Sequence, residues 1–403
     1  MKIGSLIKFH RTKQGMTQNE LAMGICSIPH LSKIENNSKE GNSETLRLLL
    51  EKLNIQLQEV KHSEQQITWL LNELQKHINY LEKEKAIEIM ERLKEYEELI
   101  IFTDSIYLYE LYKLRYYIFI NNHELAENQL NWLNPNKINF SQYERYLHSY
   151  FSALVLILRG KYMEANQELS YLLRDYSDLG AFEGEIYYHI AIVKGRLEEC
   201  SQAIIYGRKA LAIYKDHFNF KRILYTLMSL AVNYTRGKVY HEAIEVYEHL
   251  LRNVVLLGEH HLLPQIYHNM GVLYQKKGEY AFALMYFEKS LMLMSKCNDH
   301  YLSSLFNLAF MQYRMGRYEE SIENFLLLKN ESKKGQIFNL LAVYYLHLLK
   351  KNHEKALKFL EVHLIPYISK IDELNETHRN FSIFLGEYYL KEGKFEKAVQ
   401  FII

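Results

Sequence analysis

The sequence predicts an all-α protein, in which a short N-terminal helical domain precedes a long array of helical hairpins. The chain of 403 residues has only 4 Pro and 17 Gly, which argues against the turn-rich all-β and collagenous classes. An apolar content of 48%, with 33 Tyr and 19 Phe, excludes a disordered chain. Residues 1–60 read as short helical segments broken by polar turns, whereas amphipathic helices recur regularly from residue 66 onward. We therefore expect two domains, residues 1–62 and residues 63–403.

The first two predicted helices are bounded by clear start and stop signals. The first covers residues 3–14 and ends at Gly15, since glycine readily adopts the left-handed conformation that stops a helix. The second covers residues 18–23. Thr17 precedes it and Glu20 follows three positions later, which is the pattern of a capping box.

The third and fourth predicted helices follow in the same domain. The third covers residues 28–36, after a turn that contains Gly24, and we expect Ser27 to cap it. The fourth runs to Leu53, and we expect Ser43 to cap it.

Two short helices joined by a tight turn form a helix-turn-helix. The segment MTQNELAMGICSIPHLSKIEN, residues 16–36, resembles the Cro/repressor-type helix-turn-helix. The residues that match that pattern are Gly15, Thr17, Gln18, Glu20, Leu21, Ala22, Ser27, Leu31, Ser32, Ile34 and Glu35. The resemblance implies that residues 1–62 bind DNA and that the third helix enters the major groove.

The local charge agrees with a DNA-binding role. Residues 1–39 contain six Lys or Arg side chains and two Glu side chains, a net charge of +4, whereas the whole chain has +1. The resemblance implies DNA contacts from Arg11, Gln18, Ser27, Ile28, His30 and Lys33. Ile28 and Pro29 stand where the family usually has polar residues, so we expect DNA shape or half-site spacing to supply part of the specificity. Partial burial of Ile28 and a purely solvated role for Lys33 remain alternatives.

From residue 66 onward the same hairpin pattern recurs. The second helix of each predicted hairpin carries a small residue: Ala126, Ala165, Ala203, Ala243, Ala283, Ser321, Ala356 and Ala398, spaced by 35 to 42 residues. In three copies Gly278, Gly316 and Gly393 supply the turn between the two helices. This pattern resembles the tetratricopeptide repeat, whose usual period is about 34 residues. It implies a right-handed superhelix with a concave groove, built from eight hairpins and a ninth, degenerate one in residues 66–100.

A repressor-type helix-turn-helix followed by tetratricopeptide repeats resembles the peptide-sensing quorum regulators of Gram-positive bacteria. This family includes the Rap phosphatases, the neutral-protease regulator and the phospholipase regulator. The resemblance implies a cytoplasmic transcriptional regulator that binds double-stranded operator DNA and is controlled by a short signalling peptide in its groove. It also implies a homodimer or higher homo-oligomer, because such operators have paired half-sites.

The repeat register suggests where a peptide would bind. Asn269 and Asn307 each precede the small residue of the first helix by two positions, and an Asn side chain can pair with a peptide amide as donor and acceptor. Arg196, Arg236, Lys276 and Arg314 each follow that small residue by five positions. Stacked repeats would align them as a basic column that suits a peptide carboxylate. A role of the same side chains in hairpin stability remains open.

Several other functions find little support in the sequence. It has no P-loop, HExxH or GxSxG motif, so we expect no enzyme, cofactor or metal, and we expect His260, His261 and His268 to be groove or surface residues. Cys26, Cys200 and Cys297 form no CxxC, which fits a reducing compartment. No signal peptide is evident, and the apolar stretches fall short of the ~20 residues of a membrane span, so we expect no membrane partner.

Two alternatives remain beside a peptide-controlled DNA-binding regulator. The groove could dock a folded protein, or the chain could act as a phosphatase-like modulator of a phosphorelay, with DNA binding secondary. The second alternative would need a reactive amide from a residue such as Gln65, Gln66 or Gln75. The last predicted helix, residues 395–403, ends on apolar residues, which predicts burial against a partner subunit or back onto the array.

Overall fold

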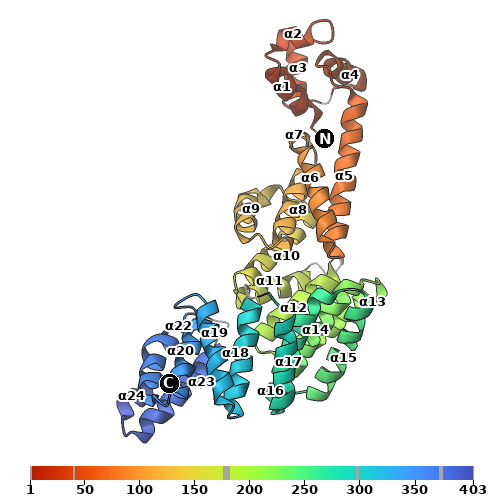
Figure 1. The fold of residues 1–403 in the computed structure, drawn as a ribbon. Coiled ribbons are helices and arrows are strands. Elements are labelled where there is room, and N and C mark those ends of the chain that lie inside the picture. The colour runs from red at the N-terminus through yellow and green to blue at the C-terminus, as the bar shows by residue number, and fades with distance from the viewer. Residues whose placement is uncertain (1, 40, 176–181, 296–298, 372–374, 403) are drawn as a thin grey trace. The chain divides into compact units, whose positions relative to one another are not determined.

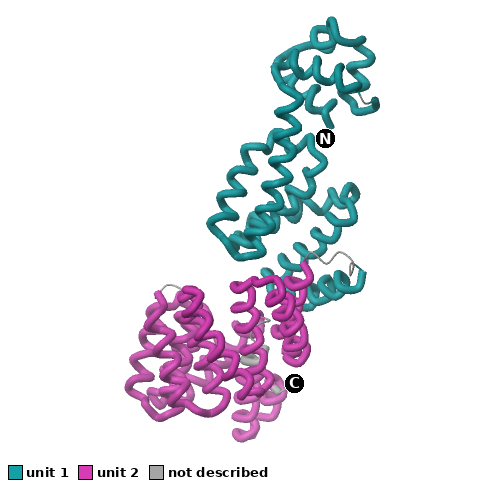
Figure 2. Tube along the Cα trace, turned by 90° about the vertical axis from the view of Figure 1, so that its right-hand side faces the viewer, with its two compact units in different colours: residues 1–181 teal, residues 182–403 magenta. Residues whose placement is uncertain are grey.

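The computed structural model describes residues 2–39, 41–175, 182–295, 299–371 and 375–402. All regular elements among them are helical, so the predicted all-α class is confirmed. The chain folds into two compact units, residues 1–181 and 182–403 (Figure 2). Cys297 lies outside the described residues.

The first unit contains eleven α-helices in its described part (Figure 1). They are α1 (Ile3–Lys13), α2 (Gln18–Ala22), α3 (Ile28–Glu35), α4 (Ser43–Lys52), α5 (Leu57–Asn79), α6 (Lys83–Lys94), α7 (Glu97–Ile100), α8 (Ile106–Phe119), α9 (His123–Asn136), α10 (Gln142–Leu158) and α11 (Tyr162–Asp175). A short 3-10 helix, Lys137–Asn139, follows α9.

The second unit continues the same helical pattern. Its described helices are α12 (Glu183–Arg196), α13 (Cys200–Asp216), α14 (Phe220–Arg236), α15 (Tyr240–Leu256), α16 (Leu263–Lys277), α17 (Tyr280–Met292), α18 (Asp299–Arg314), α19 (Tyr318–Glu331), α20 (Ile337–Leu349), α21 (His353–Phe359), α22 (Ile365–Ile368), α23 (Asn375–Lys391) and α24 (Phe395–Ile402). A π-helical turn, Leu360–Leu364, joins α21 to α22.

Helices α1 to α4 form a small domain that we call the head. Its apolar core includes Leu6, Leu21, Leu31 and Leu50, all buried. Helix α5 begins inside the head, because its residue Val60 belongs to the same core. The predicted domain boundary after residue 62 therefore falls within a continuous helix and stays a prediction.

The helix caps of the head follow the sequence with one correction. Thr17 and Glu20 form the predicted capping box of α2. Ser27 occupies the N-cap position of α3, but its side chain makes no capping hydrogen bond to the described residues. The prediction that Ser43 caps α4 is wrong, because the Asn42 side chain accepts the N–H of Thr45 at 2.7 Å. Asn and Ser are equally good caps, and the chain enters the helix one residue earlier than expected.

A buried ion pair ties three helices of the head together. The Arg11 guanidinium donates through Nε and Nη2 to the two carboxylate oxygens of Glu35, at 2.6 and 3.0 Å. Its Nη1 donates to the carbonyl of Met16 at 2.7 Å, and the Gln18 amide donates to Glu35 at 2.7 Å. The Glu35 side chain is only 1% exposed and that of Arg11 11%. A carboxylate at this depth requires such partners, because desolvation of an unpaired charge is costly.

Nine hairpins can be traced in the described residues, in agreement with the predicted eight or nine. They are α5–α6, α8–α9, α10–α11, α12–α13, α14–α15, α16–α17, α18–α19, α20–α21 and α23–α24. All eight predicted small residues are buried. The first helices of successive hairpins in the second unit also contact one another, α12 with α14, α14 with α16, α16 with α18 and α18 with α20. The first helices therefore line up side by side.

The helices of a hairpin cross too closely for a larger side chain. A Cβ atom placed on Gly271 of α16 would lie 2.5 Å from the ring of Phe287 on α17. Real Cβ atoms do not approach a ring carbon this closely, so even Ala at this position would force the two helices apart.

Every turn between paired helices has one residue in the left-handed conformation. The nine residues are Leu81, Asn121, Gly160, Glu198, Lys238, Gly278, Gly316, Lys351 and Gly393. The predicted role of Gly278, Gly316 and Gly393 is thus confirmed. Five hairpins use a residue with a Cβ instead, which costs roughly 1 kcal/mol each and is outweighed by the packing of the hairpin.

His148 of α10 is buried as a neutral side chain. It is 3% exposed, its Nδ1 lies 3.4 Å from the Ser152 hydroxyl, and its Nε2 has no hydrogen-bond partner among the described residues. Burial lowers the pKa of His148 from 6.5 to about 4.

We predict that Glu35→Ala loosens the head, because it leaves the Arg11 charge without its carboxylate. The expected loss is roughly 3 kcal/mol of local stability. Hydrogen exchange of the α1–α3 amides in the full chain would report it as faster exchange. Glu44→Ala is the matched control, because Glu44 belongs to an exposed pair with Arg47 that contributes little. Equal exchange in the two variants would contradict the structural role of Glu35.

We predict that His148 makes the protein less stable as the pH falls. The unfolded chain takes up a proton on this residue below about pH 6.5, whereas the folded chain stays neutral until about pH 4. The contribution of His148 to the free energy of unfolding therefore decreases by roughly 2 kcal/mol when the pH falls from 7 to 5. Urea unfolding at pH 7 and pH 5 measures this decrease in the free energy of unfolding. In His148→Leu the decrease should be smaller by roughly 2 kcal/mol than in the original chain. Exposed His217→Leu should behave like the original chain, and an unchanged pH dependence in His148→Leu would exclude this effect.

Candidate functional site

The first candidate surface is the N-terminal part of α3. Ser27, Ile28 and Lys33 are exposed, and His30 is partly buried. The Ile28 side chain is 43% exposed, which leaves its apolar surface open to a thymine methyl group. Three of these residues lie on one short helix and Ser27 lies at its N-cap position, as the helix-turn-helix pattern requires.

Arg11 and Gln18 are placed differently from those four. Both hold Glu35 through the hydrogen bonds described above, and Glu35 raises the pKa of Arg11 further. Their predicted DNA contacts stay predictions, and both side chains have a structural role that the sequence analysis missed. The signal was present, because Glu35 lies four positions after Leu31, on the same buried face of the helix, and a carboxylate there needs a cationic partner.

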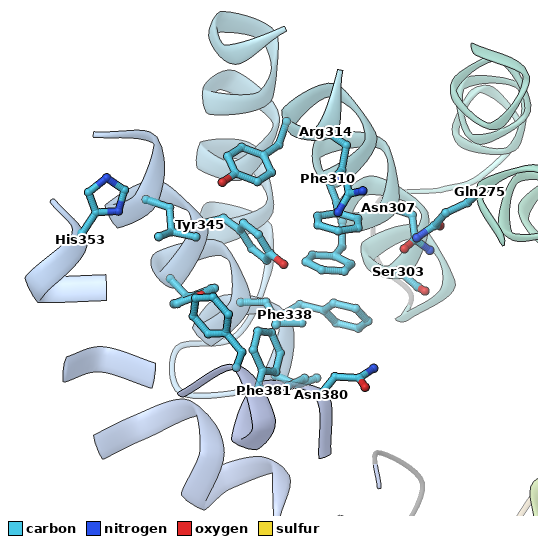
Figure 3. A pocket seen from close by; sticks show the side chains of 17 residues that line it. Gln275, Ser303, Asn307, Phe310, Arg314, Phe338, Tyr345, His353, Asn380 and Phe381 are labelled. Atoms are coloured by element: carbon cyan, nitrogen blue, oxygen red, sulfur yellow. The ribbon is translucent and has the colours of Figure 1, made fainter. Parts of the chain in front are cut away.

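The second candidate site is a cavity of about 910 Å³ in the second unit (Figure 3). It is bounded mainly by α18, α20 and α23, with Gln275 from α16 and His353 from α21. Its lining residues are Gln275, Ser303, Phe306, Asn307, Phe310, Tyr313, Arg314, Ile337, Phe338, Leu341, Tyr344, Tyr345, Leu348, His353, Asn380, Phe381 and Phe384. This volume lies in the range of small-molecule and peptide pockets, roughly 300–1,000 Å³.

The wall of the cavity is largely aromatic. Tyr345 stands at its centre and contacts the rings of Phe306, Phe310 and Tyr313, with ring centroids 5.9, 5.5 and 5.7 Å apart. Burial raises the pKa of Tyr344 to about 12 and also raises that of Tyr345. Both hydroxyls therefore stay protonated at neutral pH, and the wall carries no negative charge.

Polar groups surround this aromatic wall. Gln275, Asn307 and Ser303 stand together on one side of the cavity, and His353 stands at the opposite end (Figure 3). Arg314 supplies a cation at the rim, where its Nη2 donates to the Tyr280 hydroxyl at 3.2 Å. The site thus combines a large apolar surface with amide groups and one positive charge.

The predicted peptide-binding residues are only partly brought together. Asn307 and Arg314 both line the cavity, whereas Asn269, Lys276, Arg236 and Arg196 do not. Arg236 donates to the carbonyl of Gly195 at 2.6 Å, so it also joins α14 to the end of α12. The open alternative of a role in hairpin stability therefore has support at Arg236, and the peptide role of all six residues stays a prediction.

The sequence analysis missed most of the cavity wall. Tyr344 and Tyr345 are buried as core residues are, yet they also face the cavity. Phe338, Phe381 and Phe384 were not singled out. The available signal was the run IFNLLAVYYLHLL of α20, which is apolar on every face and so must meet apolar partners on more than one side.

The residues considered for other chemistry are not assembled into a site. Gln75 accepts a hydrogen bond from the Tyr112 hydroxyl at 2.7 Å, Gln65 is exposed, and Gln66 is partly buried. His268 Nδ1 lies 2.7 Å from the Ser304 hydroxyl, and burial lowers its pKa to about 4. In the described part of the chain, no three His, Cys, Asp or Glu side chains are grouped as metal ligands.

Two further observations concern the chain's surface and end. Among the described residues, none of the helices combines the length and apolar character that crossing a membrane requires. In α24, Phe401 is partly buried and stacks on Tyr389 with ring centroids 6.1 Å apart. The apolar end thus folds at least in part back onto the array, which was one of the two expected outcomes.

Comparison with known families matches both parts of the chain. A helix-turn-helix family matches residues 7–60. A tetratricopeptide-repeat family matches residues 222–296 and 262–326.

Two curated relatives cover most of the chain. The transcriptional activator NprA of Geobacillus stearothermophilus is 27% identical over 398 residues, 94% of this chain and 97% of NprA. The regulatory protein RapD of Bacillus subtilis (strain 168) is 23% identical over 73% of this chain and 85% of RapD.

Solved structures share the fold. The apo quorum sensor NprR from B. thuringiensis has a TM-score of 0.68 at 24% identity, over 84% of this chain and 97% of NprR. NprR in complex with its cognate peptide NprX has a TM-score of 0.67 at 24% identity, over 83% and 96% of the two chains. The predicted resemblance to the peptide-sensing quorum regulators is therefore confirmed, since this chain is similar to NprA and NprR over most of its length and joins a helix-turn-helix to tetratricopeptide repeats.

Proposed function

We propose that this chain is a transcriptional regulator that binds operator DNA through α3 and is controlled by a short signalling peptide in the cavity of the second unit. The observation that carries the peptide part is the aromatic cavity with Asn307 and Arg314 at its edge. The similarity to NprA, a transcriptional activator, and to NprR, which has been solved with a peptide, supports the same function. The proposal includes a cytoplasmic location, where operator DNA is found.

The geometry of stacked first helices suits an extended peptide. Neighbouring packed helices lie about 8–10 Å apart, and an extended chain advances about 3.3 Å per residue. About three peptide residues would thus separate the contact with Asn269 on α16 from the contact with Asn307 on α18. A peptide of five to eight residues would then reach the cavity, and its apolar side chains would bury against the aromatic wall.

The polar groups at the rim would orient such a peptide. The Asn side chains offer one donor and one acceptor to each peptide unit, which an extended backbone can satisfy. Arg314 would pair with a carboxylate, either the C-terminus or an acidic side chain. A folded protein domain could not enter a cavity of about 910 Å³, so the site favours a peptide over a docked domain.

We propose a regulatory role without catalysis. RapD and other relatives with Rap names match at lower identity than NprA, which leaves phosphorelay modulation as the second candidate. The carbonyl of Gln75, one of the amides considered for that chemistry, is engaged by Tyr112. DNA binding by the exposed residues of α3 therefore has more support.

We also propose a homodimer, because paired half-sites need two heads. The last hairpin carries exposed apolar side chains that a partner subunit would cover: Ile383, Leu390, Phe395 and Val399. Apolar surface of this kind is typical of subunit interfaces.

We predict that Asn307→Ala and Asn269→Ala weaken peptide binding by roughly 1–3 kcal/mol each, because each leaves a peptide amide without its partner. The measurement is calorimetry with synthetic peptides of five to eight residues, taken from open reading frames next to the gene. Asn330→Ala, at an exposed position of α19, is the matched control. Unchanged affinity in both variants would move the site elsewhere, and no binding by any such peptide would contradict the proposal.

We predict that Lys33→Ala weakens DNA binding at all sequences and lowers the salt dependence by about one phosphate contact. The DNA would be a duplex selected from a random pool with the full chain, and binding would be followed by fluorescence anisotropy at several salt concentrations. Lys83→Ala, at an exposed position of α6, should bind like the original chain. Light scattering of the complex should give two chains per duplex. An unchanged salt dependence in Lys33→Ala, or one chain per duplex, would count against the DNA-binding mode.

A further inference from the structure

Residues 97–103 connect the first hairpin to the second, yet they also form part of the head. We call them the bridging segment. Phe102 is 8% exposed and belongs to the core of the head, where its ring centroid lies 5.3 Å from that of Phe9 on α1. Leu99 packs against the same core, and the N–H of Lys2 donates to the carbonyl of Phe102 at 2.7 Å. Figure 1 shows α7, which lies in this segment, beside the N-terminus.

Apolar packing holds the segment to the head more strongly than charge does. Lys13 Nζ lies 2.9 Å from the carboxylate of Glu98, but the two side chains are 54% and 74% exposed. An exposed pair of this kind contributes little, because water and salt screen it. Burial of the Phe102 ring is worth several times more.

The other side of the bridging segment is attached to the second hairpin. The carboxylate of Glu97 accepts a hydrogen bond from the hydroxyl of Tyr109 on α8 at 2.7 Å, and Lys113 Nζ lies 3.5 Å away. The Tyr109 hydrogen bond holds the pKa of Glu97 below its usual value, and burial raises the pKa of Tyr109. The donor and acceptor therefore keep their roles at neutral pH. Tyr109 is itself buried, so this contact is anchored in the body of the array.

The head is thus attached to the repeats at two places. Helix α5 continues from the head core into the first hairpin, and the bridging segment joins the head core to α8. Because Val60 of α5 already packs in the head core, the bridging segment adds a second constraint on the orientation of the head.

We propose that the bridging segment is a coupling element through which the second hairpin controls the stability and orientation of the DNA-binding head. The segment also completes the head core, so that residues 1–62 lack part of it. Helix α8 then communicates with α1 through Tyr109, Glu97 and Phe102. This inference concerns regulation of the head and needs neither the peptide nor the operator of the proposed function.

Hydrogen exchange of the full chain, followed by mass spectrometry, tests the coupling. Tyr109→Phe removes one hydroxyl on α8 and leaves the head residues unchanged. We expect the α1 amides to exchange roughly five- to tenfold faster, since one partly buried, charge-assisted hydrogen bond is lost. Tyr116→Phe, on the same helix, is the matched control and should leave the exchange of α1 unchanged. Phe102→Ala, which removes the ring from the head core, should speed the hydrogen exchange of the α1 amides by a larger factor.

Three outcomes would overturn the proposal. If Phe102→Ala speeds the hydrogen exchange of the α1 amides but Tyr109→Phe, like Tyr116→Phe, does not, the segment is part of the head and does not couple it to α8. If Tyr109→Phe speeds the hydrogen exchange of α5, α8 and α10 as much as that of α1, the substitution destabilises the protein generally. If neither variant changes the exchange of α1, the segment does not hold the head. The measurement contains no DNA and no peptide, so its failure would not bear on the proposed function.

Discussion

The close crossing of the two helices in each hairpin is the constraint on which the remaining structure depends. At each crossing a residue no larger than Ala or Ser is buried, and a Cβ on Gly271 would already collide with Phe287. In the second unit the first helices of successive hairpins also contact one another, from α12 to α20. The side chains of these helices border a common surface. The aromatic cavity is the part of that surface where α18, α20 and α23 leave space.

The repeat array was predictable from the sequence because its constraint leaves a periodic mark. A small residue about every 40 positions is visible without any structure, and all eight of the predicted ones are buried. The turns were only partly predictable. Leu81, Glu198 and Lys238 adopt the left-handed conformation although they carry a Cβ, so the turn geometry is imposed by helix packing and not by the local residue.

The functional surfaces were less predictable, because they depend on contacts between distant residues. Arg11 fitted the pattern of a phosphate-binding cation, yet its guanidinium is engaged by Glu35, 24 positions away. The aromatic wall of the cavity consists of residues that also read as core, such as Tyr345. Helical periodicity cannot distinguish a side chain that fills the interior from one that borders an open space. The contribution of Phe102 to the head was equally hidden, since it lies 42 residues after Val60, the preceding buried member of the head core.

The central claim is that a peptide bound in the cavity changes the affinity of the head for DNA. The most direct test is to measure the affinity of the full chain for its selected operator by fluorescence anisotropy, without and with a saturating peptide ligand. The account predicts a change of roughly 5- to 150-fold, and the operator should change the affinity for the peptide by the same factor, since coupling free energies are reciprocal. An operator affinity that is the same with and without bound peptide would contradict the account.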